Sequence, residues 1–362
     1  MNNQISARDV AARLGTDQEP FILDVREPDE VAAWAIPGAV NIPLGDLPAR
    51  AGEIPRDEPV VVVCASGGRS SHATDALARA GWDVHNLTGG MAEWGNVYDT
   101  AEHQAGAATI VQVRRRGKGC LSYVIGSGDE AYVVDPSIDI SHYLEVAADK
   151  GWRITKVFDT HLHADHLSGA RALAEATGAT LHLNPADTFA FDYTPLHDGD
   201  HYELPGGVAM SVAAMHTPGH TMGSTMYFVG DDAVLTGDTL FVEGVGRPDL
   251  ADKAEEFAHN LYRSLQERVL TLPESTFVLP GHYSEGVPVH PHVPVGATLA
   301  DLRRTLEPLQ LDEDDFVTWA TARAVPRPPN YVEIVKANMG RPETSLALLQ
   351  SLELGPNRCS AS

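Results

Sequence analysis

The sequence predicts an α/β protein of two domains, and three observations lead to this fold class. The chain has 362 residues, a length typical of two or three ordinary domains. In its first hundred residues, short apolar runs are each followed by a segment of helical character, as in a parallel α/β domain. Beyond residue 108 the pattern changes to successive strands with Gly-rich turns, and a mainly helical region follows Pro294.

The expected domain boundaries follow from these changes of pattern. We expect one domain over residues 1–98 and a second over 108–362, whose core ends near residue 285 and whose C-terminal extension fills 286–362. Residues 99–107 are small and polar, so we expect them to form a linker.

Each element is expected from its local pattern. In the first domain we expect strands over Phe21–Val25 and Val60–Cys64, and a helix over Ser70–Ala80 that ends at Gly81. In the second domain we expect helices over Ser141–Lys150 and Glu255–Leu270. The strands expected there are Thr109–Val113, Leu121–Ile125, Ala131–Val134, Ile154–Asp159, Val208–Ala213, Thr225–Val229, Ala233–Leu235 and Phe277–Leu279.

Charge and composition exclude several classes of protein. The net charge of −24 argues against a nucleic-acid-binding protein, because binding phosphates needs a basic surface. No stretch approaches the roughly 20 apolar residues that span a bilayer, and the N-terminus lacks the features of a secretory signal. The three cysteines, Cys64, Cys120 and Cys359, are odd in number and widely separated, which argues against a disulfide framework. We therefore expect a cytoplasmic protein with no membrane partner.

A cysteine lies between an expected strand and an expected helix, at the start of Cys64-Ala-Ser-Gly-Gly-Arg-Ser70. The glycines allow backbone N–H groups to point inward, and the following helix adds its positive end, so a thiolate and a bound anion are both stabilised. We expect Ser66, Gly67 and Gly68 to bind the anion and Arg69 to supply a fixed charge. A reactive, sulfur-carrying thiol is the preferred interpretation, and a buried structural cysteine is the alternative.

The first hundred residues resemble the rhodanese family. The resemblance rests on the Cys64 loop, Asp24-Val-Arg-Glu27, Ile36–Pro43 and Gly89–Trp94. It implies that Cys64 is the nucleophile that carries a persulfide and that Arg69 belongs to its cradle. Trp34-Ala35 stands where the family usually has Gly-His.

The strongest signal in the sequence is a histidine cluster directly after an expected strand, Thr160-His-Leu-His-Ala-Asp-His166. Three more candidate ligands follow beside glycines, namely His220, Asp238 and His282. Histidine and carboxylate ligands suit zinc, iron or manganese. A solvated His-rich loop is the alternative for the cluster, and Cys120 is expected to be a packed strand residue.

The region from about Ala107 to His282 resembles the metallo-β-lactamase superfamily, which implies an αββα sandwich. All seven ligands of a dinuclear site would then be present, namely His161, His163, Asp165, His166, His220, Asp238 and His282. A dinuclear zinc thioester hydrolase similar to glyoxalase II is therefore an alternative function.

Two features resemble the persulfide dioxygenase branch of that superfamily. One is Gly244-Val-Gly-Arg-Pro-Asp249, and the other is the fusion to a rhodanese-like domain. The resemblance implies a single Fe(II) held by His161, His220 and Asp238, in an arrangement that leaves positions open for oxygen and substrate. His163, Asp165, His166 and His282 would then orient the ligands, or hold a second metal, and Zn(II), one or two per chain, is the alternative cofactor. Arg247 and Tyr283 are expected to bind substrate.

The expected reaction is the oxidation of a low-molecular-weight thiol persulfide by O2 to sulfite, coupled to thiosulfate or persulfide sulfur transfer on Cys64. A non-catalytic persulfide sensor or carrier is the third alternative. The sequence does not determine the oligomeric state, and a homo-oligomer is one option.

Overall fold

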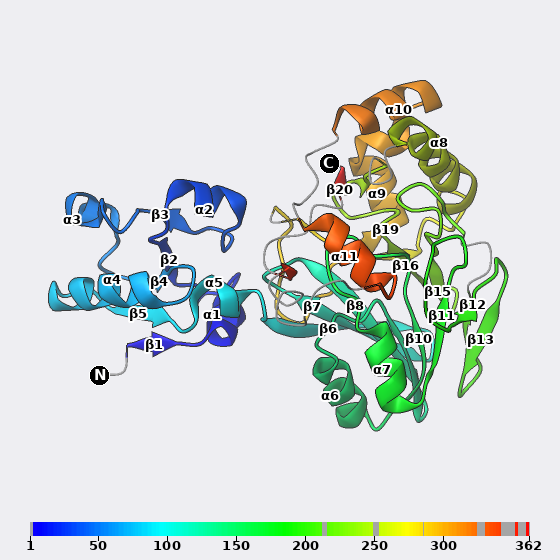
Figure 1. Cartoon of the computed structure of the whole chain (residues 1–362), viewed down its shortest axis with the longest axis horizontal. Helices are drawn as coiled ribbons and strands as arrows, with labels where there is room; N and C mark the ends of the chain where they lie inside the picture. The colour runs from blue at the N-terminus through cyan, green and yellow to red at the C-terminus, as the bar shows by residue number, and fades with distance from the viewer. Residues whose placement is uncertain are drawn as a thin grey trace.

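The computed structural model describes residues 3–211, 216–248, 253–284, 286–323, 330–341, 352–353 and 360–361, and for 208–211 and 360–361 the backbone alone. Asp249 and Cys359 lie outside the described residues. Two lobes are visible in Figure 1, a smaller one formed by the N-terminal third of the chain and a larger one formed by the rest. In the described part of the chain, every helix is too short or too polar to span a bilayer.

The N-terminal lobe is a five-stranded parallel sheet with strand order β1-β5-β4-β2-β3. Its central strand β4 (Val60–Val63) consists of four buried valines, which pack alternately into the cores on the two faces of the sheet. The other strands are β1 (Gln4–Ile5), β2 (Phe21–Asp24), β3 (Val40–Asn41) and β5 (Val84–Leu87). The helices are α1 (Ala7–Arg13), α2 (Pro28–Ala33), α3 (Leu47–Arg50), α4 (Gly68–Arg79) and α5 (Gly90–Trp94). The expected strands and helix of this domain are confirmed.

Two sheets packed face to face form the centre of the larger lobe. A seven-stranded sheet has the order β12-β11-β10-β9-β8-β7-β6, and a six-stranded sheet has the order β13-β14-β15-β16-β18-β19. The first contains β6 (Tyr98–Ala105), β7 (Ala108–Arg115), β8 (Cys120–Ser127), β9 (Glu130–Val134), β10 (Arg153–Phe158), β11 (Thr180–Leu183) and β12 (Thr194–Pro195). The second contains β13 (His201–Leu204), β14 (Val208–Ser211), β15 (Tyr227–Val229), β16 (Ala233–Gly237), β18 (Phe277–Pro280) and β19 (Ala297–Thr298).

Helices cover the outer faces of both sheets, so that the lobe has four layers (Figure 1). The helices α6 (Ser141–Lys150) and α7 (Ala170–Thr177) pack on the seven-stranded sheet through one apolar cluster. On the six-stranded sheet, α8 (Ala254–Ser264), α9 (Leu299–Thr305) and α10 (Glu313–Ala322) pack through another. The expected αββα sandwich and the helices of the C-terminal region are confirmed, the latter including α11 (Tyr331–Asn338).

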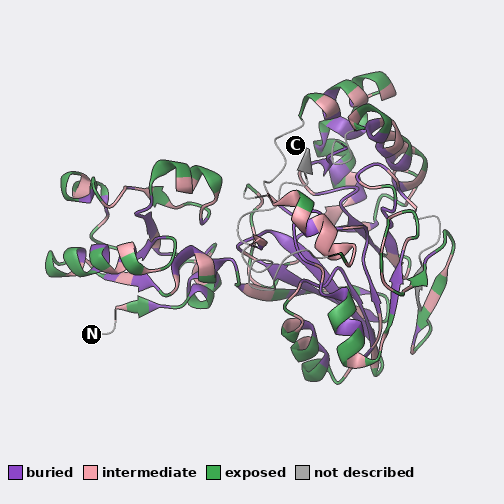
Figure 2. Cartoon of the chain, in the orientation of Figure 1, coloured by how far each residue is buried: buried purple, intermediate pink, exposed green. Residues whose placement is uncertain are grey.

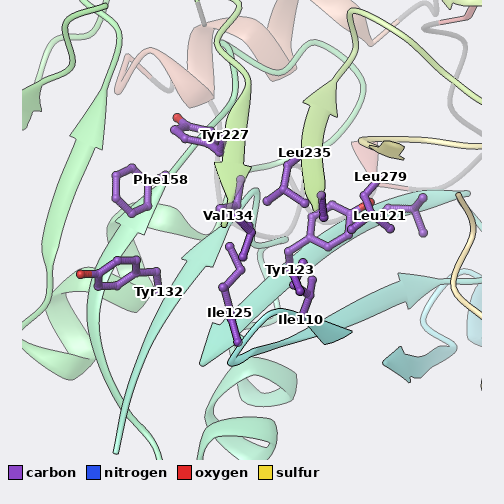
Figure 3. Packing of buried hydrophobic residues seen from close by; sticks show 14 of the residues in the cluster. Ile110, Leu121, Tyr123, Ile125, Tyr132, Val134, Phe158, Tyr227, Leu235 and Leu279 are labelled. Atoms are coloured by element: carbon purple, nitrogen blue, oxygen red, sulfur yellow. The ribbon is translucent and has the colours of Figure 1, made fainter. Parts of the chain in front are cut away.

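A third apolar cluster fills the space between the two sheets. Figure 3 shows Ile125 and Val134 from one sheet packed toward Leu235 and Leu279 from the other. Along β8 the side chains alternate, since Ile125 joins this inner cluster and Val124 the outer one with α6 and α7. Burial is accordingly concentrated in the strands (Figure 2). Because both faces of each sheet are covered, strand ends at one edge of the sandwich can hold polar groups in a buried position.

The expected linker over 99–107 is wrong. Most of it belongs to β6, which pairs with β7 along its whole length, from Tyr98 opposite Arg115 to Ala105 opposite Ala108. The strand lies at the edge of the sheet and exposes alternate residues, so its polar composition resembles that of a linker. Arg114 also binds Asp99 at 2.5 Å from within the sheet.

Candidate active sites in the two domains

The cysteine loop joins β4 to α4 and has the expected geometry. Gly67 adopts a left-handed backbone conformation with φ of +94°, directly before the helix. The Sγ atom of Cys64 accepts hydrogen bonds from the Gly67 N–H and from the Ser70 hydroxyl, both at 3.2 Å. A Cβ at Gly90 would approach the Cys64 carbonyl to 2.2 Å, so only glycine fits beside the loop.

The electrostatics of the loop favour a thiolate. Burial by itself would raise the pKa of the Cys64 thiol, but hydrogen bonds from Ser70, Ser66 and Gly67 lower it below its ordinary value. Ser66 and Gly67 thus donate backbone N–H groups toward the sulfur, while Gly68 starts the helix. The hydrogen bond from the Ser70 hydroxyl to Cys64 was not predicted from the sequence. The position of Ser70 at the start of the expected helix is the signal that could have indicated it.

Arg69 has a partner on another helix. Its guanidinium binds both carboxylate oxygens of Glu30 on α2, each at 2.6 Å. The hydrogen bond with Arg69 lowers the pKa of Glu30 to about 2. The fixed positive charge of Arg69 is therefore close to Cys64 but is already bound by Glu30. An anionic sulfur donor would compete with the Glu30 carboxylate for the guanidinium.

The histidine cluster lies in the loop after β10 and is held in place by Asp135. The carboxylate of Asp135 accepts hydrogen bonds from the Thr160 backbone N–H at 2.6 Å and from the Thr160 hydroxyl at 2.9 Å. Asp135 itself has a positive φ of +53° at the end of β9, a conformation that costs free energy for a non-glycine residue.

Three expected ligands converge in the buried interior. The Nε2 atoms of His161 and His220 lie 3.7 and 3.4 Å from Asp238 Oδ2, and the three ligand atoms all lie within 4.8 Å of one another. All three residues are 3% exposed or less. Among the described residues, none of these three atoms has a hydrogen-bond partner. Buried polar atoms without partners are rare, so the three atoms fit the ligands of a metal ion.

The other faces of the ligands are fixed by hydrogen bonds. The Nδ1 atom of His220 donates to the Arg247 carbonyl at 3.0 Å, and Thr160 Oγ1 lies 2.8 Å from His161 Nδ1. Burial lowers the pKa of both His161 and His220, which keeps the rings neutral. Burial would raise the pKa of Asp238, but its histidine neighbours, His282 first, lower it well below its ordinary value. The donor set is therefore two neutral imidazoles and one carboxylate, which suits a divalent metal ion with open coordination positions.

A second group of candidate ligands adjoins the first. Asp165 Oδ2 lies 2.8 Å from His282 Nε2, and Asp165 Oδ1 lies 3.1 Å from His166 Nδ1. Cys120 Sγ lies 3.7 Å from Asp165 Oδ2, which the sequence interpretation did not anticipate. The histidines His282 and His166 offset the effect of burial and lower the pKa of Cys120 to about 7. Cys120 starts β8, and the isolated bridge that pairs it with His282 could not be read from the sequence.

His163 differs from the other histidines of its loop. It lies against Asp135, with Nε2 at 3.1 Å from Oδ1, and against Asp159 at 3.8 Å. Despite burial, Asp135 and Asp159 raise the pKa of His163 well above its ordinary value. Its Nδ1 has no hydrogen-bond partner among the described residues. Asp135 therefore fixes the orientation of the His163 ring, while Nδ1 is available to a ligand.

The two expected substrate-binding residues of this domain are both buried. Arg247 is 1% exposed, and its carbonyl holds His220 as described above. Tyr283 follows His282 and donates its backbone N–H to the Gly119 carbonyl at 3.0 Å. That substrate reaches the side chains of either residue remains a prediction.

The C-terminal extension reaches back to the histidine loop. Asn338 on α11 donates its side-chain amide to the carbonyls of His163 and His166, at 2.9 and 2.8 Å. The carboxylate of Glu353 accepts the Leu167 N–H at 2.5 Å and forms a buried ion pair with Arg115. The extension thus holds the loop that carries the candidate ligands, a role for which the sequence offers no motif.

The two lobes meet at the segment that precedes Cys120. The indole Nε1 of Trp34 donates to the Gly117 carbonyl at 2.7 Å, and Arg115 donates to the Gly95 carbonyl at 2.8 Å. A cavity of about 630 Å³ lies between the lobes. Its lining includes Ala32 and Ala33 from α2, the Arg116–Gly119 turn and the Tyr283–Ser284 segment.

Comparisons with known proteins agree with this architecture. Residues 115–282 match the model of the metallo-beta-lactamase superfamily, and residues 6–96 match that of the rhodanese-like domain. The hydroxyacylglutathione hydrolase of Methylobacillus flagellatus is 36% identical over 156 residues, which cover 43% of this chain and 59% of the relative. The chain therefore spans less than two thirds of that relative's length.

Persulfide dioxygenases match a larger share of the chain. The mitochondrial persulfide dioxygenase ETHE1 of Bos taurus is 28% identical over 241 residues, covering 65% of this chain and 89% of the relative. The crystal structure of ETHE1 from Myxococcus xanthus is similar with a TM-score of 0.57 and 29% identity, over 64% of this chain and 97% of that one. The chain thus combines a rhodanese-like domain with a metallo-β-lactamase domain, and it is homologous to the persulfide dioxygenases in sequence and structure.

Proposed function

We propose that this protein oxidises the outer sulfur of a low-molecular-weight thiol persulfide with O2, using one Fe(II) bound by His161, His220 and Asp238. The observation that carries the proposal is the buried convergence of these three ligand atoms within 4.8 Å, each without a hydrogen-bond partner among the described residues. The similarity to persulfide dioxygenases supports the same reaction.

The balanced reaction is RSSH + O2 + H2O → RSH + SO3²⁻ + 2H⁺. When bound, the iron would supply open positions at which oxygen and the terminal sulfur meet. The chain's own residues keep the imidazoles neutral through burial and keep the Asp238 carboxylate ionised, while the carbonyl of Arg247 sets the tautomer of His220. Burial of the ligands also excludes bulk water from the reacting sulfur.

Cys64 would exchange sulfane sulfur with the same pool of persulfides. The Cys64 thiolate attacks the outer sulfur of a persulfide and releases the thiol, forming Cys64–S–S⁻. Sulfite can then remove that sulfur as thiosulfate, which regenerates the thiolate: Cys64–S–S⁻ + SO3²⁻ → Cys64–S⁻ + S2O3²⁻. The N–H groups of the loop and the Ser70 hydroxyl stabilise the anionic sulfur in both states. The partners are thus small sulfur compounds and O2, with no role for nucleic acid.

Oxygen consumption by iron-loaded protein tests the proposal. We expect anaerobically prepared wild type to bind about one iron per chain and to consume O2 with glutathione persulfide, releasing sulfite. Cys64→Ser should retain this oxygen uptake but lose thiosulfate formation, because the two reactions use different residues. No oxygen uptake with several thiol persulfides would reject the dioxygenase, and sulfur loading on Cys64 without turnover would favour a carrier or sensor.

A dinuclear zinc thioester hydrolase is the second candidate. Asp165, His166 and His282 adjoin the first three ligands, and the hydroxyacylglutathione hydrolase similarity points to the same chemistry. Two zinc ions per chain together with cleavage of a glutathione thioester would support this function. The same preparation should then consume no oxygen.

A further inference from the structure

Glu30, on α2, is the side chain that binds Arg69 beside the cysteine loop. Both of its carboxylate oxygens accept a hydrogen bond from the guanidinium, at 2.6 Å each. The side chains of Glu30 and Arg69 are 33% and 36% exposed, so small solutes reach the pair. An anion that arrives at Cys64 therefore meets a guanidinium whose charge is already bound.

The neighbouring backbone holds Glu30 in this position. Its carboxylate also accepts the Glu27 backbone N–H at 3.0 Å, as part of a capping box at the start of α2. The buried guanidinium of Arg26 donates to the Glu30 carbonyl at 3.3 Å and to the Trp34 carbonyl at 2.6 Å, which ties the short helix to the end of β2. Glu30 is thus a pre-positioned partner of Arg69, and an anion binds Arg69 only in competition with a carboxylate that stays in place.

The charges around the loop do not favour a donor with two negative charges. The hydrogen bond with Glu30 is the main cause that raises the pKa of Arg69, and the charge of Glu27 adds to it. The second guanidinium, that of Arg26, is bound to Asp24 at 2.6 Å in the buried part of the domain. Two guanidiniums are thus accompanied by three carboxylates, and together these side chains offer a dianion no net attraction.

We infer that Glu30 determines the specificity of the cysteine site, which prefers a thiol persulfide over thiosulfate as its sulfur donor. The inference rests on the proposed sulfur transfer on Cys64. A persulfide brings at most one negative charge on its two sulfur atoms, whereas thiosulfate is a compact dianion that needs the guanidinium of Arg69.

The two loading reactions are Cys64–S⁻ + RSSH → Cys64–S–S⁻ + RSH and Cys64–S⁻ + S2O3²⁻ → Cys64–S–S⁻ + SO3²⁻. In each, an S–S bond to Cys64 forms and the S–S bond of the donor breaks. The first releases a thiol, which takes the proton, and the second releases the sulfite dianion. Because only the second reaction needs Arg69 for its doubly charged donor and product, Glu30 selects against it.

The same competition affects thiosulfate as a product. When sulfite removes the sulfur from Cys64, the thiosulfate that forms leaves a site in which Glu30 binds Arg69 again. Thiosulfate should therefore be a weak product inhibitor of wild type, and removal of the Glu30 charge should strengthen this inhibition.

Glu30→Gln tests the inference, since it removes the charge and keeps the size of the side chain. Metal-free, full-length protein is mixed with thiosulfate or with glutathione persulfide, and the persulfide on the peptide that contains Cys64 is measured by mass spectrometry. We expect the half-saturating thiosulfate concentration to fall at least about threefold in the variant, and that of glutathione persulfide to change less than about twofold. A freed Arg69 also lowers the pKa of Cys64 and speeds both donors, so the ratio of the two donors is compared.

Asp29→Asn removes an equal charge from an exposed position of the same helix and should keep the wild-type ratio. Glu30→Asp keeps the charge and should restore part of the discrimination. Wild type itself should prefer the persulfide, which tests the inference without any variant. A wild-type preference for thiosulfate, or an equal ratio in wild type and Glu30→Gln, would overturn it.

The assay uses neither iron nor O2, so a failure of the proposed dioxygenase reaction does not alter its result. Loading of Cys64 with an unchanged donor ratio would reject the role of Glu30 alone. Absence of loading from both donors would reject sulfur transfer on Cys64, and the inference with it.

Discussion

The hydroxyl of Ser70 lies 3.2 Å from the Cys64 sulfur and is the side chain that stabilises the thiolate. Ser70→Ala should raise the pKa of Cys64, because a hydrogen bond to the charged form is lost. We expect alkylation of Cys64 near neutral pH to slow roughly five- to tenfold and its pH profile to move to higher pH. Ser71→Ala, one residue along the helix, is the matched control. Identical profiles for wild type and Ser70→Ala would show that backbone N–H groups alone stabilise the sulfur.

Asp238 is the carboxylate of the three-residue site, which His161, His220 and Asp238 form, and it accepts the His282 Nδ1–H. Asp238→Asn removes the charge that a cation needs, so iron content should fall well below one per chain. Wild type should gain about 2.7 kcal/mol of stability at a metal concentration one hundred times Kd, and the variant should gain little. Thermal unfolding with and without Fe(II) measures this difference. Asp231→Asn, in an exposed turn, is the control, and equal metal-induced shifts in both variants would argue against the site.

At the scale of elements, α11 supports the histidine loop through one residue. Asn338 donates to two loop carbonyls and its own side-chain oxygen accepts the Ser168 N–H at 2.9 Å. Asn338→Ala should destabilise the domain by about 1–3 kcal/mol, because buried carbonyls lose their donors. It should also weaken metal binding about tenfold through misplacement of the ligands. Metal titration followed by denaturant unfolding checks both effects. Val332→Ala, an exposed change on the same helix, should change neither.

The edge strand β6 shows why element-scale prediction is uneven. The valines of β4 were predictable because a strand covered on both faces must be apolar throughout. The strand Tyr98–Ala105 was not predictable, because an edge strand with one exposed face has the composition of a loop. Only its pairing with β7 shows that this segment is a strand.

At the scale of the whole molecule, the side chain of Trp34 joins the two lobes through a hydrogen bond. Its indole N–H donates to the Gly117 carbonyl, three residues before Cys120. Trp34→Phe keeps the ring but removes this donor, so we expect a loss of about 1 kcal/mol and a wider separation between the unfolding transitions of the two domains. Differential scanning calorimetry measures this. Trp82→Phe, whose indole N–H donates to Ile54 within the first domain, is the control. A thermogram unchanged from wild type would show that the hydrogen bond does not couple the domains.

The sequence by itself determined the two domains, the reactive-cysteine loop and the identity of the residues that converge on the three-residue site. The cysteine loop follows from a local rule, since a glycine loop before a helix keeps its meaning in any surrounding structure. The three ligands were singled out from seven candidates by the resemblance to persulfide dioxygenases. Only the tertiary structure decided that Arg69 is shared with Glu30, that Cys120 joins Asp165, His166 and His282, and that Asn338 and Glu353 support the histidine loop. These contacts join residues 39 to 186 positions apart, and no periodicity or spacing along the chain encodes which strand ends and helices meet when the sandwich closes.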